Sequence, residues 1–581
     1  GQMYSGADLK SEAFNEYCRW MRVKSMDPDT RREIQSMITN MDMVYERFSS
    51  RLSFGTAGLR APLGAGTNRM NLYTVAAAAR GFARWIKARG GADKGIVISY
   101  DSRNQSEAFA EMTARMAADE GVQVYLSDTL RPVPMLSYAI NLYDAAGGVM
   151  ITASHNPAEY NGFKAYGDDG AQLMPEAAAE VSTAIEQVGD IFSVINDSLT
   201  FRQLRHNGMI EYAGANLDYR YDNLILEKLR SDQVPEEAKK NLRIVYTPLN
   251  GAGNHHVRRL LGKLGFETVA VVPEQELPDG DFPSLRVPNP EYEDTFDKAI
   301  ELAKVTMADL IIATDPDSDR LGVAVPDQDG EYCVLTGNQI GTLLMEYILG
   351  SRTMRGAIKE NSFCIASIVS TKMPRYICRR YGLELKETLT GSRFTAQAIR
   401  EGSEAGQDFV FGFEEGNGYM FSTGILDKDG VAAAIVFAQM AAMSKSVGQR
   451  LYDQLRGIYS LYKYPAEKNF SIKVEGSGYR EKMNRAMDRL RSMGRDIDLG
   501  PQTEIVELKD YQPETDMLYY NLEGGGWMAV RPSGTEPKIK IYVGLYGDEK
   551  SPEEEAEALR AKVYRLIDSL LKEPDISGDN Q

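Results

Sequence analysis

Residues 152–157 (TASHNP) place a serine, a histidine and an asparagine directly after the apolar run GGVMI. Pro157 cannot continue that run as a central strand or a helix, so the chain must turn there. Strand ends of this kind are where α/β enzymes place their chemistry. Ser154 is therefore our candidate for a side chain that carries a group covalently. The alternatives are a turn or helix N-cap role for Ser154 and a hydrogen-bonded structural role for His155.

A second loop, TDPDSDRLG, carries Asp315, Asp317 and Asp319 at alternate positions. In an extended loop, side chains two residues apart project to the same side, so the three carboxylates would repel unless a cation joined them. Ligands that are all oxygen favour Mg²⁺ or Ca²⁺. An EF-hand is excluded because its sixth and twelfth positions hold Arg320 and Pro326 here. The alternative is a solvated acidic turn.

The loop AVRPSGTEPKIKIY combines hydroxyls, a glycine and basic side chains after an apolar run. Hydroxyl groups, close backbone approach and a guanidinium fork are the parts of a phosphate-binding site. A plain turn between two strands would use the same residue types. The candidate phosphate ligands in this loop are Arg531, Ser533, Gly534, Thr535 and Lys538.

Two further loops carry weaker signals. FGFEEGNGYM sets Glu414 and Glu415 between an apolar run and two glycines. Paired acids can bind sugar hydroxyls through charge-assisted hydrogen bonds, or they can be solvated in a turn. RLSFGTAGLRAPLG places Arg60 in a glycine-rich loop, where it is either an anion contact or an exposed surface residue.

Composition limits the partners. The formal net charge of −17 argues against nucleic acid and anionic membranes, which bind basic surfaces, so any positive field for an anionic substrate must be local. The four cysteines lack CxxC spacing, which fits a reducing compartment, and we expect a cytoplasmic protein without a signal peptide. The most apolar stretch, residues 431–443, is too short to span a bilayer and predicts a buried helix.

The elements that must position these loops follow a repeated pattern of β-branched run, polar loop and helix-like stretch. Strands that alternate with helices predict parallel sheets with functional loops at the strand ends. After about residue 456 short alternating runs replace helical periodicity, and the chain ends in a helix with a stripe of Leu559, Val563, Leu566 and Leu570. We expect three similar α/β modules, at 1–211, 212–331 and 332–455, and a C-terminal α+β domain at 456–581.

Taken together and in this order, the loops resemble the signatures of the α-D-phosphohexomutase superfamily. They are TASHNP (152–157), DPDSDR (315–320), GFEEGNGY (412–419) and RPSGTEP (531–537). The similarity spans nearly the whole chain. SFGTAGLR and FEEGNGYMFSTGILDKDG are most similar to the long branch that includes bacterial phosphoglucomutases and eukaryotic enzymes acting on hexose or pentose phosphates. The resemblance implies mixed sheets and four domains around a central cleft.

The resemblance also implies a role for each loop. Ser154 would carry the phosphoryl group, and Asp315, Asp317 and Asp319 would hold one Mg²⁺ together with an oxygen of the phosphoserine. The catalytic residues around the transferring phosphoryl group would be Ser154, His155, Lys164, Arg60 and Arg320. The sugar-contacting residues would be Thr390, Gly391, Arg393, Glu414, Glu415 and Lys428. The residues that hold the phosphate that is not reacting would be Arg531, Ser533, Gly534, Thr535 and Lys538.

The activity implied is phosphoglucomutase, with glucose 1,6-bisphosphate as activator and bound intermediate and a phosphorylated sugar as partner of a monomer or weak homodimer. Phosphomannomutase, phosphopentomutase and glucose 1,6-bisphosphate synthase activities remain alternatives, as does a non-catalytic sugar-phosphate sensor. Two departures from the family signatures leave the identity of the preferred sugar open. Gly416 stands where many relatives carry Ser, and Ser392 with Arg393 stands where many carry an aromatic residue and Lys.

Overall fold

The computed structural model describes residues 6–55, 58–500, 503–534 and 536–574. Four sheets follow one another along the chain, of six, five, four and five strands. The first three are mixed and the last is antiparallel throughout. The expected fold class, three α/β modules followed by an α+β domain, is confirmed. We number the four sheets and the elements around them as domains I to IV.

Domain I is built on a sheet of order β1-β5-β4-β2-β3-β6, in which β4, β2, β3 and β6 are parallel. The runs IVISY and GGVMI form its central strands and are buried throughout, because helices cover both faces of a parallel sheet. Its strands are β1 (Leu59–Pro62), β2 (Ile96–Tyr100), β3 (Val124–Ser127), β4 (Gly147–Ile151), β5 (Tyr160–Tyr166) and β6 (Ile210–Ala213). Its helices are α1 (Gly6–Met21), α2 (Pro28–Ser36), α3 (Met41–Phe48), α4 (Leu72–Ala88), α5 (Ser106–Asp119), α6 (Val133–Leu142), α7 (Pro175–Glu186), α8 (Ile191–Asp197) and α9 (Phe201–His206).

Domains II and III repeat this arrangement with shorter sheets, of order β11-β10-β9-β7-β8 and β13-β12-β14-β15. Domain II contains α10 (Ala215–Leu229), α11 (Glu236–Asn241), β7 (Ile244–Thr247), α12 (Asn254–Leu264), β8 (Val269–Val271), α13 (Pro273–Glu276), α14 (Asp297–Thr306), β9 (Leu310–Thr314), β10 (Leu321–Pro326) and β11 (Tyr332–Val334). Domain III contains α15 (Gly337–Met354), β12 (Ser362–Ser367), α16 (Met373–Tyr381), β13 (Glu384–Thr388), α17 (Ser392–Glu404), β14 (Asp408–Glu414), β15 (Gly418–Met420), α18 (Gly430–Ser446) and α19 (Leu451–Leu461).

Each of these three domains contains the same strand–loop–strand unit. A strand with a parallel neighbour ends in a loop, and the chain returns beside it as an antiparallel strand: β4 with β5, β9 with β10, and β14 with β15. The loops of these units are the TASHNP, DPDSDR and EEGNG segments. One backbone arrangement thus presents three different chemistries at the ends of three equivalent strands.

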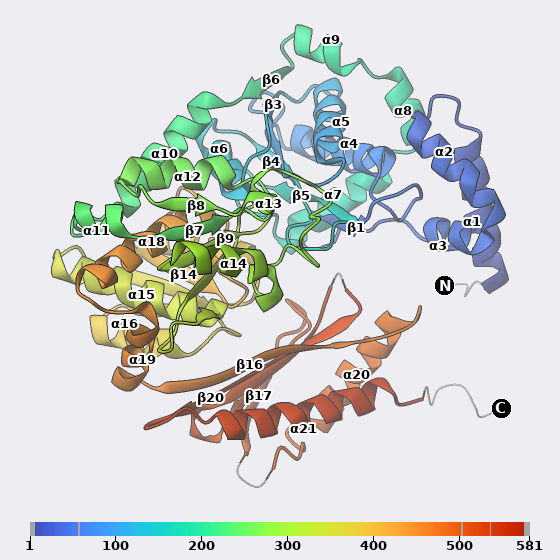
Figure 1. Ribbon diagram of the computed structural model, residues 1–581. Coiled ribbons are helices and arrows are strands. Elements are labelled where there is room, and N and C mark those ends of the chain that lie inside the picture. The colour runs from blue at the N-terminus through green and yellow to red at the C-terminus, as the bar shows by residue number, and fades with distance from the viewer. Residues whose placement is uncertain (1–5, 56–57, 501–502, 535, 575–581) are drawn as a thin grey trace.

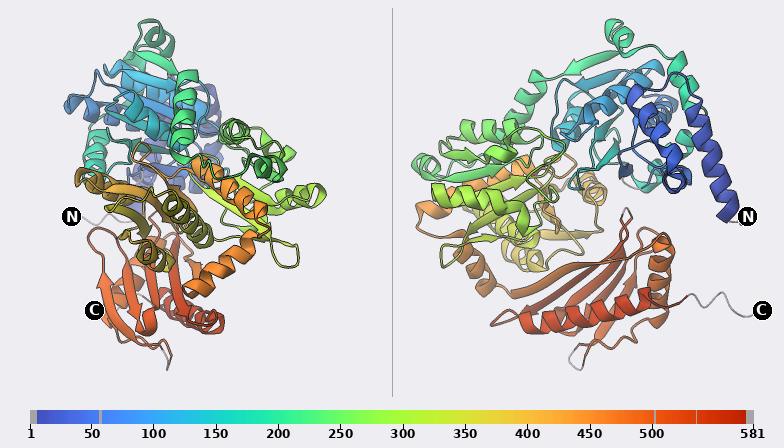
Figure 2. Two further views of the ribbon diagram at one scale, coloured as in Figure 1. Left: turned by 90° about the vertical axis from the view of Figure 1, so that its left-hand side faces the viewer. Right: turned by 45° about the vertical axis from the view of Figure 1, so that its right-hand side comes forward.

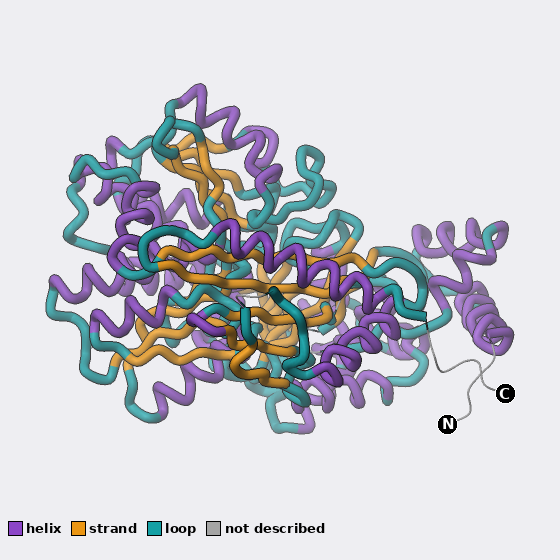
Figure 3. The backbone as a smooth tube through the Cα atoms, turned by 90° about the horizontal axis from the view of Figure 1, so that it is seen from below, coloured by secondary structure: helices purple, strands orange, loops and turns teal. Residues whose placement is uncertain are grey.

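Domain IV is an antiparallel sheet of order β16-β20-β19-β18-β17. Its elements are β16 (Tyr464–Lys473), α20 (Tyr479–Met493), β17 (Ile505–Asp510), β18 (Leu518–Leu522), β19 (Trp527–Pro532), β20 (Lys538–Gly547) and α21 (Glu553–Leu571). The two helices pack on one face of the sheet, and Figure 3 shows the long C-terminal helix lying across the strands. In the C-terminal helix the stripe includes Leu559, Val563 and Leu570, while Ile567 is fully buried and Leu566 only partly so.

Domain IV lies below the other three domains in Figures 1 and 2. Its main core is a cluster of its own, whereas one large cluster joins domains I, II and III through α18. α18 contains the stretch 431–443 and is buried on nearly all sides, as predicted. Among the described residues, no single helix has both the length and the apolar composition to cross a membrane; α18 and α19 meet both criteria only as a pair, and are bent by 91° at their junction.

The predicted domain limits cut through elements of the structure. The limit at residue 211 lies inside β6, which pairs with β3, and the limit at residue 331 separates β11 from its partner β10. The limit at residue 455 lies inside α19. Polar stretches suggested the first two limits and a loss of helical periodicity suggested the third, whereas β6, the pairing of β11 with β10, and α19 continue beyond them. We propose the limits 214, 335 and 462, just after these elements.

A lysine holds domain IV against domain III. The ammonium of Lys372 lies 4.7 Å from the centroid of the Trp527 ring and 5.2 Å from that of Tyr519. Its backbone N–H donates to the Tyr546 hydroxyl at 3.0 Å, as does Nε1 of Trp527. Asn338 of domain III donates to Glu467 of domain IV at 2.8 Å.

We predict that Lys372→Met loosens this contact, because a desolvated cation–π interaction contributes about 1–2 kcal/mol. Small-angle scattering of the ligand-free variant should give a larger radius of gyration than that of the parent. Lys359→Met, at an exposed site of domain III, is the control and should scatter like the parent. Equal radii for all three proteins would contradict the assignment.

Candidate active site

All four domains line one cleft of about 780 Å³. Domain I contributes the loop from His155 to Tyr160, and domain II contributes Arg286 to Tyr292 together with Arg320. The remaining lining residues include Thr390, Gly391, Glu414, Glu415, Gly416 and Lys428 of domain III and Arg531, Glu536, Lys538, Lys540 and Tyr542 of domain IV. The structure therefore brings together loops that are hundreds of residues apart in the sequence.

Ser154 is buried directly before the cleft-lining residues His155 to Pro157 and has a left-handed backbone conformation, with φ of 50°. Its Oγ donates to Oδ2 of Asp317 at 2.6 Å, and Nζ of Lys164 donates to the same Oγ at 2.9 Å. Lys164 also lies 3.3 Å from Asp317. Because Lys164 pairs with Met150 across β4 and β5, it returns beside the strand end that carries the serine. A hydroxyl held between an ammonium and a carboxylate is suited to carry a group.

Arg103, which sequence reasoning missed, holds the serine loop from behind. Its buried guanidinium donates to four backbone carbonyls: Ser154 at 2.6 Å, Asn156 at 2.6 Å, Pro157 at 2.9 Å and Tyr160 at 3.2 Å. Asp101 supports it, at 3.5 Å, and also accepts from Thr152 at 2.5 Å. The signal available in the sequence was DSR at the end of the apolar run IVISY. Five donors in one planar group let arginine satisfy such a loop.

The three aspartates converge, but by a tight turn rather than the extended loop that we expected. Residues 316–318 form the turn, and Ser318 has φ of 57°. The carboxylates are fully buried and offer ligand oxygens within 4.8 Å of one another. One oxygen of each lacks a hydrogen-bond partner among the described residues: Oδ2 of Asp315, Oδ1 of Asp317 and Oδ1 of Asp319.

The electrostatics of this cluster fit a bound cation. Burial, together with the neighbouring carboxylates, raises the pKa of Asp315 well above its usual range. Burial opposes ionisation of Asp319 as well, but Lys428 and Lys164 outweigh it and lower the pKa of that group. Buried carboxylates with unpartnered oxygens are stabilised by a hard divalent ion. The residues present are therefore an acceptable ligand set for such an ion.

We call residues 315–320 the metal loop. Backbone hydrogen bonds at this loop join it to loops of domains I and III. The Val133 N–H of domain I donates to the Asp317 carbonyl at 2.9 Å. Toward domain III, the Leu321 N–H donates to the Asn417 carbonyl at 3.0 Å, and the Gly430 N–H donates to the Ser318 carbonyl at 2.9 Å. The position of the aspartates thus depends on contacts from two other domains.

The loop after β14 places the carboxylates of Glu414 and Glu415 in the lining of the cleft. Glu414 accepts the Gly391 N–H at 3.1 Å, and burial raises its pKa. The Ser367 hydroxyl donates to Oε2 of Glu415 at 2.7 Å, so this carboxylate oxygen is fixed by a side chain of the same domain. Thr390 lines the cleft. Arg393 instead lies over the Phe394 ring, at 4.9 Å, outside the cleft-lining residues that the structure describes.

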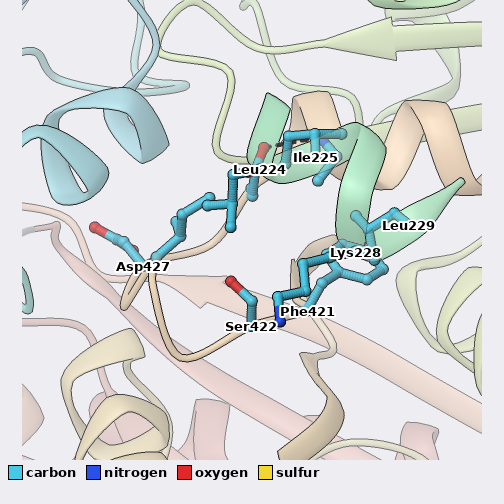
Figure 4. Close-up of a pocket in the computed structure, with 10 residues that line it drawn as sticks. Leu224, Ile225, Lys228, Leu229, Phe421, Ser422 and Asp427 are labelled. Atoms are coloured by element: carbon cyan, nitrogen blue, oxygen red, sulfur yellow. Dashed lines mark hydrogen bonds between the residues drawn. The ribbon is translucent and has the colours of Figure 1, made fainter. Parts of the chain in front are cut away.

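Lys428 lies between two anchored aspartates. Tyr166 donates to Asp427 at 2.5 Å and Tyr221 donates to Asp429 at 2.9 Å. Figure 4 shows Ser422 and Asp427 on this segment, near Leu224 and Lys228 of α10. Lys428 itself pairs with Asp319 at 3.4 Å. The two tyrosine hydrogen bonds therefore fix the backbone on both sides of Lys428, which places its ammonium next to the metal loop.

The alternation of side chains along the strands of domain IV places its basic residues on the face toward the cleft. In β20 Ile539 and Ile541 are fully buried in the domain core, so Lys538, Lys540 and Tyr542 face the cleft. Arg531 reaches it in the same way from β19, next to buried Val530. Sequence reasoning missed Lys540, although its spacing from Lys538 was the available signal. Ser533 is buried and accepts the Glu536 N–H at 3.1 Å, and Gly534 accepts from Arg480 at 3.2 Å. Thr535 lies outside the described residues.

The remaining catalytic candidates, Arg60 and His155, lie at the junction of domains I and IV. Arg60 donates to Asn156 at 3.0 Å, and Asn156 donates to Glu536 of domain IV at 3.2 Å. Burial, followed by Arg320 and Arg60, lowers the pKa of His155 well below its usual range. The lowered pKa keeps the imidazole uncharged, because burial and the neighbouring cations oppose its protonation. The local positive field expected of this acidic protein is therefore present in the cleft.

Comparison with known proteins agrees with this arrangement. The phosphoglucomutase/phosphomannomutase models for alpha/beta/alpha domains I, II and III match residues 51–190, 221–330 and 336–462. The model for the C-terminal domain of the same family matches residues 500–565. A phosphoglucomutase/phosphomannomutase family protein from Burkholderia thailandensis superposes with a TM-score of 0.66 at 19% identity, covering 90% of this chain and 98% of that one. The open form of parafusin, a phosphoglucomutase from Paramecium, gives 0.66 at 17% identity, over 90% and 95% of the two chains.

Sequence relatives extend the comparison. The chain is 36% identical to a phosphoglucomutase of Staphylococcus epidermidis, over 87% of this chain and 92% of the relative. It is 37% identical to a phosphoglucomutase of Staphylococcus aureus, over 86% and 90%. The chain therefore belongs to the α-D-phosphohexomutase superfamily, as a phosphoglucomutase-type enzyme of the phosphoglucomutase/phosphomannomutase family.

The Arg103 contacts predict a positioning role. Arg103→Lys keeps the charge but cannot reach four carbonyls, so the serine should shift and kcat should fall about 100-fold with little change in KM. Steady-state kinetics with a sugar phosphate would measure this. The matched control is Arg80→Lys, since Arg80 is equally buried in domain I and pairs with Asp119 and Glu120 at 2.8 Å. A parent-like kcat for Arg103→Lys would contradict the role.

Lys540 predicts a pH dependence. Burial, then Arg531 and Lys538, lower the pKa of Lys540 to about 8. Below pH 8 the ammonium attracts phosphate, and above it the charge is lost, so kcat/KM should fall as pH rises through about 8. Lys540→Arg should move that fall to higher pH, because arginine stays protonated. Lys468→Arg, on exposed β16, is the control; an unmoved fall in Lys540→Arg would refute the assignment.

Proposed function

We propose that the protein interconverts α-D-glucose 1-phosphate and glucose 6-phosphate by passing a phosphoryl group through Ser154. The observation that carries this proposal is the Ser154 hydroxyl, 2.9 Å from the Lys164 ammonium and 2.6 Å from Asp317, directly before the residues that line a cleft rich in cations. Phosphoryl transfer needs positioning and charge stabilisation more than covalent chemistry from the protein. Both are supplied around this hydroxyl.

The metal proposed is Mg²⁺, held by Asp315, Asp317 and Asp319 together with an oxygen of phosphorylated Ser154. The unpartnered oxygens of the three carboxylates support this ligand set. A structure of Aspergillus fumigatus N-acetylphosphoglucosamine mutase contains magnesium and superposes with a TM-score of 0.50 at 15% identity, over 94% of this chain and 100% of that one. When bound, the ion would draw negative charge from the seryl oxygen.

Side chains of the protein carry out the phosphoryl transfer and the accompanying proton transfer. In the first transfer the bond between phosphorus and the Ser154 oxygen breaks, and a bond forms to the free hydroxyl of the sugar monophosphate. Lys164 and Arg320 stabilise the oxygens of the moving group. The proton of the attacking hydroxyl passes to the buried Nδ1 of His155, which has no hydrogen-bond partner among the described residues. Lys164 is the alternative acceptor.

The product of the first transfer is a bisphosphate, glucose 1,6-bisphosphate, which must turn in the cleft before its other phosphate returns to Ser154. Arg531, Lys538 and Lys540 then hold the phosphate that is not reacting, at the domain IV end. Long, separately mobile basic side chains suit this because they must accept two orientations of the sugar. The contact between Asn156 and Glu536 joins the domain I and domain IV loops, which helps to exclude water.

The sugar is assigned by analogy with the staphylococcal phosphoglucomutases, so mannose and pentose phosphates remain the second candidates. A panel of glucose 1-phosphate, mannose 1-phosphate and ribose 1-phosphate, each with Mg²⁺ and catalytic glucose 1,6-bisphosphate, separates them by kcat/KM. Formation of glucose 1,6-bisphosphate from an outside phosphoryl donor would identify a synthase.

We predict that Ser154→Ala lowers kcat for glucose 1-phosphate by at least about 10⁴-fold, because removal of a nucleophile abolishes the covalent route. Ser99→Ala, which alters another buried serine of domain I, should leave kcat near that of the parent. Mass spectrometry of the parent after incubation with glucose 1,6-bisphosphate should show phosphate on the Ser154 peptide. Undiminished activity in Ser154→Ala would refute the mechanism, and an unphosphorylated Ser154 in an inactive parent would favour a sensor.

A further inference from the structure

One acidic side chain in the cleft comes from a domain that sequence reasoning had not linked to the sugar. Glu291 belongs to the segment of domain II that precedes the 3₁₀ helix Glu293–Phe296, and it lines the cleft together with Glu414 and Gly416 of domain III. Its side chain is 37% exposed. It can therefore meet a bound ligand.

The backbone beneath Glu291 is held firmly. Asn289 and Pro290 are buried, and Oδ1 of Asn289 accepts the Glu291 N–H at 3.0 Å. Thr295 donates to the Asn289 carbonyl at 2.6 Å. Pro290 packs so closely on β10 that a Cβ atom on Gly322 would lie 2.6 Å from its ring. A carboxylate on such a base is presented to the cleft from a defined position, which specificity requires.

Glu291 lies where a side chain of residue 416 would otherwise project. A Cβ atom on Gly416 would lie 3.1 Å from Oε1 of Glu291 and 3.6 Å from Nη1 of Arg320. A contact of 3.1 Å is tighter than side chains normally make, so a Cβ atom at residue 416 would require the carboxylate to shift by a few tenths of an ångström. The glycine thus leaves room for an acid that reaches the loop after β14 from the neighbouring domain.

Charge decides what Glu291 can bind. The carboxylate forms an ion pair with Arg320, whose side chain is 14% exposed, and the guanidinium remains next to the metal loop. An anion at this place repels phosphate but accepts hydrogen bonds from hydroxyl groups, with the added strength of its charge. On the side of the cleft lined by Glu291 and Glu414, the matching ligand group is a hydroxyl.

We infer that Glu291 is a specificity-determining residue that accepts a hydrogen bond from one hydroxyl of the bound sugar phosphate, in the space left open by Gly416. The inference rests on the proposed function and adds to it a sugar contact from domain II. Glu291 and Glu414 then read the sugar from two domains, so that a sugar without the right hydroxyl leaves a carboxylate unpaired.

The test combines substrate and protein changes. kcat/KM is measured for glucose 1-phosphate and for its 2-, 3- and 4-deoxy analogues with the parent, Glu291→Ala and Glu291→Gln. In the parent, loss of the hydroxyl that Glu291 contacts should lower kcat/KM about 10- to 100-fold. In Glu291→Ala, removing the same hydroxyl from the substrate should lower kcat/KM by less than about twofold. Removing either of the other two hydroxyls should lower kcat/KM by the same factor as in the parent. Glu291→Gln should retain part of the effect.

Two further variants sharpen the result. Gly416→Ala adds only the methyl group that would crowd Oε1, and it should reduce the contribution of the same hydroxyl as Glu291→Ala does. Glu293→Ala removes an exposed acid two residues away, outside the cleft lining that the structure describes, and should behave like the parent.

The outcomes are distinct. If each of the three deoxy analogues loses the same factor in Glu291→Ala as in an active parent, Glu291 only holds Arg320, and this inference alone is overturned. If the parent turns over no sugar phosphate of the panel, the proposed function fails and the inference fails with it. Selective loss of discrimination at one position supports the inference.

Discussion

The site depends on negative charge that is buried where three domains meet. Asp315, Asp317 and Asp319 are fully buried, and the serine hydroxyl donates to one of them. Burying a carboxylate is costly unless a counter-charge or a hydrogen bond compensates. Lys164 and Lys428 lie near two of the acids, yet an oxygen of each aspartate still lacks a partner among the described residues. The geometry therefore fits a bound cation beside the Ser154 hydroxyl.

Three equivalent strand–loop–strand units make this meeting possible. Because each loop follows a buried strand and returns as an antiparallel one, its backbone is held at both ends by a sheet. The loops then bind one another: Asp317 accepts from Val133 of domain I, and Leu321 donates to Asn417 of domain III. Domain IV adds cleft-lining cations from a sheet whose main core is a cluster of its own.

Much of this could be predicted from sequence. Alternating strand and helix patterns predicted three α/β modules and a different last domain, and four loop motifs indicated the family; both predictions are confirmed. Domain limits were harder, because turns inside β-sheets have the same composition as linkers. Among the predicted sugar-contacting residues, Arg393 differs from the others because it stacks on Phe394 outside the described lining of the cleft. The individual roles of the site residues remain predictions.

The sequence by itself determined which chemical groups are available and which strand ends carry them, since motif spacing and hydrophobic periodicity are local properties. Only the tertiary structure decided which groups meet. Arg103 and Glu291 are ordinary charged residues in sequence, and their importance lies in contacts with carbonyls of residues 154–160 and with the space above Gly416. Such contacts join segments 50 to 125 residues apart, and no local pattern encodes a distance that the packing of whole domains sets.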